Sequence, residues 1–238
     1  MSETYYVGAY WGCRPESALE CAQRAETFFR LLSQCHPTYA RWYEKASSTR
    51  RALQLQFDPT TDTFMRFFGK KTYQLGKDGF VFGAWTGHLE NQGGMVSLTC
   101  GSAAEVTPNG VLLYLPSEPP GSELLLTLPV LTGVMRAMAL AWNPDWAYAG
   151  SEDFRDCLSQ EISDTFVGWL TYISRRWGEV PALPEPVRIE PVEDKGTLLV
   201  LGPERLSASN PEHLALGRHL QQVFKAHGLL KKLPERRP

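Results

Sequence analysis

Apolar residues near the start of the chain follow two different periods, which predict a strand followed by a helix. The segment from Thr4 to Tyr10 is rich in aromatic and β-branched residues, as is typical of a strand. From about Pro15 to Ser33, apolar residues recur every three or four positions and share one helical face: Ala18, Ala22, Ala25, Phe29 and Leu32. Because proline suits the first turn of a helix, we expect this helix to begin at Pro15.

Between residues 80 and 115 the pattern changes to short apolar runs of the kind found in strands. Three runs, FVFGAWTG, GMVSLTCG and GVLLYLP, follow one another along the chain. Glycine-rich or Asn-Gly turns separate them, and we assign Asn109-Gly110 to one of these turns. Three strands in succession at this spacing predict an antiparallel meander.

A second long helix is expected to open at Pro129. Its apolar stripe is formed by Leu131, Met135, Met138 and Trp142. The helix must end near Trp142, because Pro144 disfavours helical geometry in the residue before it.

The remaining pattern predicts shorter elements and one further helix. A short helix is expected after Ser47 or Ser48, and an acidic one from an N-cap at Ser151 through Leu158. Short strands are expected at 146–149, 165–173 and 196–202, and the proline-rich segment 179–191 is expected to be extended. The last helix is predicted to start at Asn210-Pro211 and to stop at Gly228.

Strands therefore come in runs and do not alternate strictly with helices. This order predicts an α+β fold, with a mainly antiparallel sheet and helices packed over one face. We expect residues 1–178 to form the main α+β domain. Residues 179–238, a proline-rich connection with a strand and the C-terminal helix, are too few for an independent core and are expected to pack on the same domain.

The composition is that of a globular protein without an obvious polyanionic partner. The 238 residues are 43% hydrophobic, and 24 basic and 26 acidic residues give a net charge of −2. Nothing in this balance calls for nucleic acid as a partner. The N-terminus lacks the pattern of a signal peptide and no apolar run reaches the length of a membrane span, so we expect a cytoplasmic protein with no membrane partner.

A search for catalytic and ligand-binding motifs gives no match. No pair of the five cysteines has C-x-x-C spacing, and the five histidines lack metal-site spacing, so we expect no metal and no cofactor. There is no G-x-S-x-G elbow, P-loop or dinucleotide motif. A hydrolase with dispersed residues, built from Asp or Glu with His36 or His88, stays open as an alternative.

The surplus of aromatic residues is the unusual feature of the sequence. Tyrosine, tryptophan and arginine are enriched among residues that dominate protein–protein binding energy. The stretch YARWYEK has this composition, and AWNPDWAYAG reads as a helix-to-strand corner between Trp142 and Trp146. We therefore predict a partner-binding surface formed by Tyr39, Arg41, Trp42, Tyr43, Trp85, Asp145, Trp146, Glu152, Asp153 and Asp156.

These segments also carry a family likeness. YYVGAYWGCRPESALECAQR, the Tyr39 and Trp42 pair, FVFGAWTG, SLTCGS and AWNPDWAYAG resemble, in this order, the immunity protein 52 family of bacterial polymorphic toxin systems. The resemblance covers residues 4 to 150. It implies a cytoplasmic antidote, not an enzyme, that binds a toxin encoded beside it. It further implies a toxin of the restriction-endonuclease-like nuclease class, delivered by contact-dependent or type VI secretion.

The partner expected from this resemblance is a cognate toxin. The acidic run that includes Glu152, Asp153 and Asp156 could mimic phosphate toward a nuclease, which is our inference from charge and no part of the family pattern. A structural or adaptor subunit of a secretion system is the alternative to an antidote. The sequence leaves homo-oligomerisation open, as it does the choice between plugging of an active site and allosteric inhibition.

Overall fold

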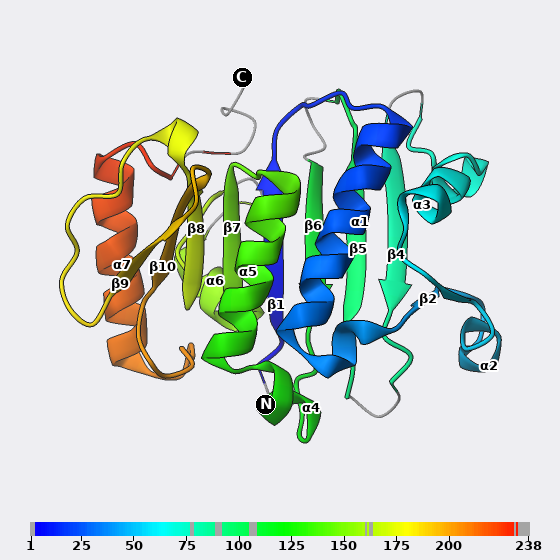
Figure 1. Ribbon diagram of the computed structural model, residues 1–238. Helices are drawn as coiled ribbons and strands as arrows, with labels where there is room; N and C mark the ends of the chain where they lie inside the picture. Colours follow the sequence, from blue (N-terminus) through cyan, green and yellow to red (C-terminus); the bar gives the residue numbers. More distant parts are fainter. Residues whose placement is uncertain are drawn as a thin grey trace.

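The strands of this protein form one antiparallel sheet, seen in a computed structural model that describes residues 3–76, 79–88, 92–104, 109–159, 161, 164–230 and 232. Ten strands pair in the order β3-β2-β4-β5-β6-β1-β7-β8-β10-β9 (Figure 1). They are β1 Tyr5–Trp11, β2 Trp42–Glu44, β3 Gln56–Phe57, β4 Phe80–Trp85, β5 Met95–Cys100, β6 Asn109–Tyr114, β7 Trp146–Ser151, β8 Leu170–Ser174, β9 Arg188–Val192 and β10 Gly196–Val200.

Seven α-helices of the described residues surround this sheet. They are α1 Ala18–Cys35, α2 Thr49–Ala52, α3 Thr61–Phe68, α4 Gly121–Leu125, α5 Leu128–Trp142, α6 Glu152–Leu158 and α7 Pro211–Ala226. Short 3-10 turns occupy 37–40, 71–73 and 175–177. No helix in the described part of the chain has both the length and the apolar character needed to cross a membrane.

The helices α1 and α5 lie side by side on one face of the sheet (Figure 1). Between them and the sheet, Trp11 of β1 stacks on Trp142 of α5 with ring centroids 5.4 Å apart, and the edge of Phe28 meets Trp142. On the same face, α3 places Phe64 and Phe67 against Phe82 of β4. These large buried rings form the main core, since each removes a wide apolar surface from water.

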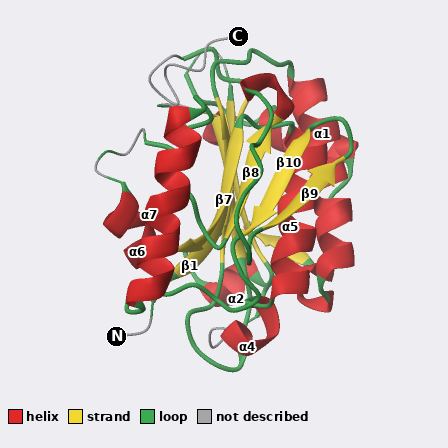
Figure 2. Cartoon of the chain, turned by 90° about the vertical axis from the view of Figure 1, so that its left-hand side faces the viewer, coloured by secondary structure: helices red, strands yellow, loops and turns green. Residues whose placement is uncertain are grey.

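The predicted α+β class and mainly antiparallel sheet are confirmed. Helices also cover part of the second face, because α6 and α7 lie on the side of the sheet opposite α1 and α5 (Figure 2). Gln221 of α7 donates to the carbonyl of Leu158 at 2.7 Å and accepts from Val167 N–H. This buried amide fixes α7 to α6 and to the segment before β8.

The long helices agree with the hydrophobic periodicity, and their ends follow capping chemistry. The prediction that the first helix begins at Pro15 is wrong by three residues. Ser17 is the N-cap, since its hydroxyl accepts from Glu20 N–H while the Glu20 carboxylate accepts from Ser17 N–H at 2.8 Å. The predicted end of α5 at Trp142 is confirmed, and Asn143 closes it in the left-handed region with φ 45°.

The meander predicted at 80–115 is confirmed, but its Asn109-Gly110 turn is wrong. Asn109 is the first residue of β6, and its buried amide accepts from Ser102 N–H and donates to the Gly12 carbonyl. The proline-rich segment was expected to be a connection, yet it contains β9, which pairs with β10 at the edge of the sheet. Pro191 is tolerated there because an edge strand can lack one ladder hydrogen bond.

Tyrosine rings lie flat on the sheet wherever a neighbouring glycine leaves room. Tyr148 lies over Gly150 and Gly168, and its hydroxyl donates to the Ser151 carbonyl at 2.8 Å. A Cβ at Gly168 would contact the Tyr148 ring and would lie 2.8 Å from the Ala149 carbonyl oxygen. The ring is fully buried and cannot move aside without disturbing Phe166, which packs on it at 4.6 Å.

Gly168→Ala is therefore expected to lower the free energy of unfolding by about 2 kcal/mol, the usual cost of overpacking a core. Gly202→Ala is the matched control, because a Cβ there meets no atom within 4 Å. We expect the control to change stability by less than about 1 kcal/mol, and in the stabilising direction. Chemical denaturation of both variants measures this, and equal stabilities would contradict the packing of Tyr148.

A candidate protein-binding face

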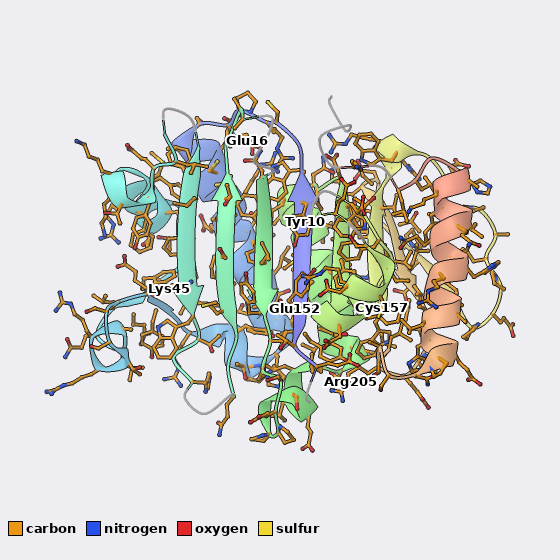
Figure 3. All side chains as sticks on the ribbon, turned by 180° about the vertical axis from the view of Figure 1, so that it is seen from behind. Tyr10, Glu16, Lys45, Glu152, Cys157 and Arg205 are labelled. Atoms are coloured by element: carbon orange, nitrogen blue, oxygen red, sulfur yellow. The ribbon has the colours of Figure 1, made fainter. Side chains whose placement is uncertain are left out.

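One part of the sheet has no helix over one of its faces. On β4, β5 and β6, side chains alternate between buried positions toward the helices and half-exposed positions on the far side. In Figure 3, seen from behind, no helix of the described residues lies over these strands or over the adjoining β1. We name this the open face and define it by its outward residues: Tyr10, Tyr43, Val81, Gly83, Trp85, Met95, Ser97, Thr99, Leu112 and Tyr114.

The open face is kept flat by small residues at its middle. Ser97 is paired with Gly83 on β4 and with Leu112 on β6, so it lies at the centre of the surface. Tyr10 lies across Gly8 and Gly110, since a Cβ at Gly8 would be 2.6 Å from the Tyr10 hydroxyl. Burial raises the pKa of Tyr10, so this ring presents a neutral phenol at physiological pH. A flat, half-apolar surface of this kind is suited to another protein surface.

A cavity of about 460 Å³ opens at one end of the open face. It lies between α2 and the ends of β4 and β5, and its lining includes Lys45, Thr49, Trp85, His88, Met95 and Tyr114. The indole N–H of Trp85 is buried and has no hydrogen-bond partner in the described structure. The volume is sufficient for one or two large side chains of a partner.

The open face has margins of opposite charge. Lys45 lines the cavity, and the exposed Arg50 and Arg51 lie on α2 between the lining residues Thr49 and Ala52; we name these three cations the basic margin. On the other side, α6 borders β1, where Arg155 lies 5.8 Å from the Tyr6 ring. The carboxylates of α6, Glu152, Asp153 and Asp156, form the acidic margin, although Asp156 is also paired with Arg155 at 2.8 Å.

The residues predicted from YARWYEK are divided by the strand alternation. Tyr39 and Trp42 are buried, their rings stack, and the Trp42 indole donates to the Tyr39 carbonyl at 2.9 Å. Arg41 is exposed between them. Tyr43 lies on the open face beside Trp85, with 6.2 Å between ring centroids. Of the predicted aromatics, Tyr43 and Trp85 are thus brought together on the open face, while Tyr39 and Trp42 belong to the core.

Asp145 and Trp146 lie in the interior at the corner between α5 and β7. The Asp145 carboxylate accepts from Gly12 N–H at 3.0 Å, from Arg176 at 2.6 Å and from the Trp177 indole at 3.1 Å. The Trp146 indole donates to the Phe166 carbonyl at 3.1 Å. This corner joins the ends of β1, β7 and β8, so both residues support the fold and are not free for a partner.

The two histidines considered for a hydrolase have different surroundings. His36 accepts from Thr38 N–H at the start of a 3-10 turn, whereas His88 lines the cavity with Lys45. Among the described residues that line this cavity there is no carboxylate. Within the described ranges, no three His, Cys, Asp or Glu side chains are grouped so that they could hold a metal ion.

Comparison with known proteins identifies the class. The sequence model of the immunity protein 52 family matches residues 3–233, so the chain belongs to this family and the predicted resemblance is confirmed. No curated protein matches the sequence. Among solved structures, the Pseudomonas aeruginosa T6SS protein PA0821 is similar with a TM-score of 0.53 and 11% identity, over 92% of this chain and 72% of that one. At this identity the likeness shows a shared fold.

Asp145→Ala is expected to lower the free energy of unfolding by about 3 kcal/mol, because it leaves a buried N–H and an indole N–H without an acceptor. Asp145→Asn keeps one acceptor oxygen and should cost less. Glu204→Ala, at an exposed loop position, is the control and should stay within about 0.5 kcal/mol of the parent protein. Thermal and denaturant unfolding test this, and a stable Asp145→Ala protein would contradict the role of the corner.

Proposed function

We propose that this protein neutralises a cognate toxin by binding it with the open face. Membership of an immunity protein family supports a toxin as the partner. The observation that carries the choice of surface is the uncovered stretch of β4, β5, β6 and β1, whose outward residues are half-exposed aromatic, apolar and small polar groups. In this proposal inhibition needs binding alone, and the chain performs no catalytic step.

The finer identity of the toxin is part of the same proposal. We propose a nuclease, delivered by contact-dependent or type VI secretion and met in the cytoplasm. The acidic margin on α6 supports this choice, because carboxylates beside a docking face can occupy a surface that otherwise binds phosphate. Of its three residues, Asp153 is the one that is both exposed and not engaged by Arg155.

The first test is co-expression with the C-terminal domain of the toxin encoded beside this gene. We expect cells to die with the toxin domain alone, to survive when this chain is present, and the two proteins to co-purify. DNA and RNA integrity in the dying cells tests the nuclease assignment separately. A harmless neighbour, or one that does not bind, would overturn the proposed function.

Ser97→Arg tests whether the open face is the binding surface. A long cation at the centre of the open face should hold the partner away. We expect it to raise the dissociation constant by roughly 30-fold or more, which is the size of the loss at a binding hot spot. Ser33→Arg makes the same change at an exposed position of α1 on the opposite side of the sheet, and should leave binding unchanged.

Both variants are compared with the parent protein by calorimetry and by growth protection, after circular dichroism has shown an unchanged melting temperature. Met95→Ala, a milder truncation on the same face, guards against a folding defect in Ser97→Arg and should weaken binding by about tenfold. Full protection and unchanged affinity for both open-face variants would exclude this surface.

A further inference from the structure

The basic margin lies beside the open face, and its charges have no ion-pair partner among the described residues. Between residues 41 and 71 the sequence has seven Lys or Arg and three Asp or Glu, whereas the whole chain has 24 and 26. Glu44 is already engaged, by Lys70 at 3.6 Å and by the Tyr73 hydroxyl at 2.7 Å. Among the described residues, no carboxylate pairs with Lys45, Arg50 or Arg51.

Lys45 is directed onto the open face by the packing of its own side chain. Its methylene groups lie on Gly83, since a Cβ there would be 2.9 Å from Lys45 Cε and 3.1 Å from Nζ. The ammonium group is therefore held over β4 (Figure 3). A lysine that covers apolar surface with its stem while its charge stays in water is ready to meet an anion without further ordering.

The cavity beside these cations has apolar walls. Met95, Trp85 and Tyr114 come from the strands, and Thr49 and Ala52 come from α2, which also carries Arg50 and Arg51. A partner segment that fits both the cavity and the basic margin needs an apolar side chain for the cavity and carboxylates for the cations. Arginine favours carboxylates through paired hydrogen bonds.

We propose that the toxin contacts this end of the open face with a carboxylate-bearing segment, whose acidic groups pair with Lys45, Arg50 and Arg51 and whose apolar side chain enters the cavity beside Trp85. This inference rests on the proposed function and adds the chemistry of the partner. A nucleic-acid strand is the other polyanion that three cations could attract. The acidic margin on the same face and the net charge of −2 make a protein segment the better fit.

The charge contribution is tested with the triple variant Lys45→Glu, Arg50→Glu and Arg51→Glu. We expect its association rate with the toxin domain to fall tenfold or more, because charges at an interface margin act mainly on association. The parent protein should associate more slowly as salt rises from about 50 to about 500 mM, and the triple variant should lose this dependence. Biolayer interferometry with purified toxin domain measures both.

The matched control reverses three exposed cations elsewhere: Arg30→Glu on α1, with Arg218→Glu and Lys225→Glu on α7. Its net charge equals that of the triple variant, so a general charge effect would slow both proteins equally. We expect the control to keep at least half of the association rate of the parent. Equal slowing of the two variants would overturn the assignment of these three residues.

The cavity is tested by Ala46→Trp, which places a large ring at its rim from an exposed position. We expect a dissociation rate at least tenfold faster than that of the parent, whereas Ala46→Ser should behave as the parent does. Unchanged dissociation of Ala46→Trp would overturn the apolar anchor.

The failures of the two proposals are distinguishable. If the parent neither binds the toxin domain nor protects cells, the proposed function is wrong. If the parent binds and protects while the triple variant and Ala46→Trp are indistinguishable from it, this inference alone is wrong. Loss of binding to a single-stranded DNA probe in the triple variant, with toxin binding intact, would assign the basic margin to nucleic acid instead.

Discussion

The width of the sheet relative to its helices is the constraint on which the rest of the structure depends. Ten strands spaced by about 4.8 Å give a sheet roughly 45 Å across, whereas one helix covers about 10 Å of it. The helices α1 and α5, with the short α3, lie over one face. On the other face, α6 lies toward β7 and α7 lies toward the β10 and β9 end of the sheet, and no helix of the described residues covers the strands from β4 to β1.

The residues on the open face suit a sheet surface that has no helical cover. Most inward positions of β4 to β6 are apolar. Packing on this one face is enough to fix the strand register, because a shift by one residue would exchange the inward and outward side chains. Outward positions are mixed: Ser97 and Thr99 are polar, Gly83 is covered by the Lys45 stem, and Tyr10 lies flat on its glycine neighbours. The surface can therefore stay in water until a partner covers it.

Hydrophobic periodicity was sufficient to predict most of the elements that pack against many neighbours, but the helix α3, which packs on α1 and β4, was not predicted. Periodicity gave α1, α5, α7 and the meander, since each has an apolar set of the right period. The elements β2, β3 and β9 were missed because two to five residues hold no full period, and prolines disguised β9. The start of α1 was displaced because Pro15 was preferred over the capping pair of Ser17 and Glu20.

The candidate surface was only partly predictable, for a related reason. Composition indicated YARWYEK, but burial alternates along it, so Trp42 and Tyr43 have opposite surroundings. The outward residues Ser97 and Leu112 gave no signal, since alternation shows that one face is buried and does not show whether the other is covered. Lys45, Arg50 and Arg51 were visible as a local surplus of positive charge. Their significance depends on Gly83 and the cavity, which only the folded chain brings beside them.

An exposed apolar sheet surface carries a risk of self-association, and the arrangement of charge restricts the orientation of such a contact. Two copies whose open faces met with the basic margins opposed would repel each other, whereas the reversed orientation would set basic against acidic margins. The free edges of the sheet are also protected, by the shortness of β3 and by Pro191 in β9. The net charge of −2 does not reveal that basic and acidic residues lie at opposite margins. This separation of charge favours a partner of complementary polarity over a random hydrophobic contact. The strands that the helices leave uncovered therefore favour a partner whose charges complement the two margins.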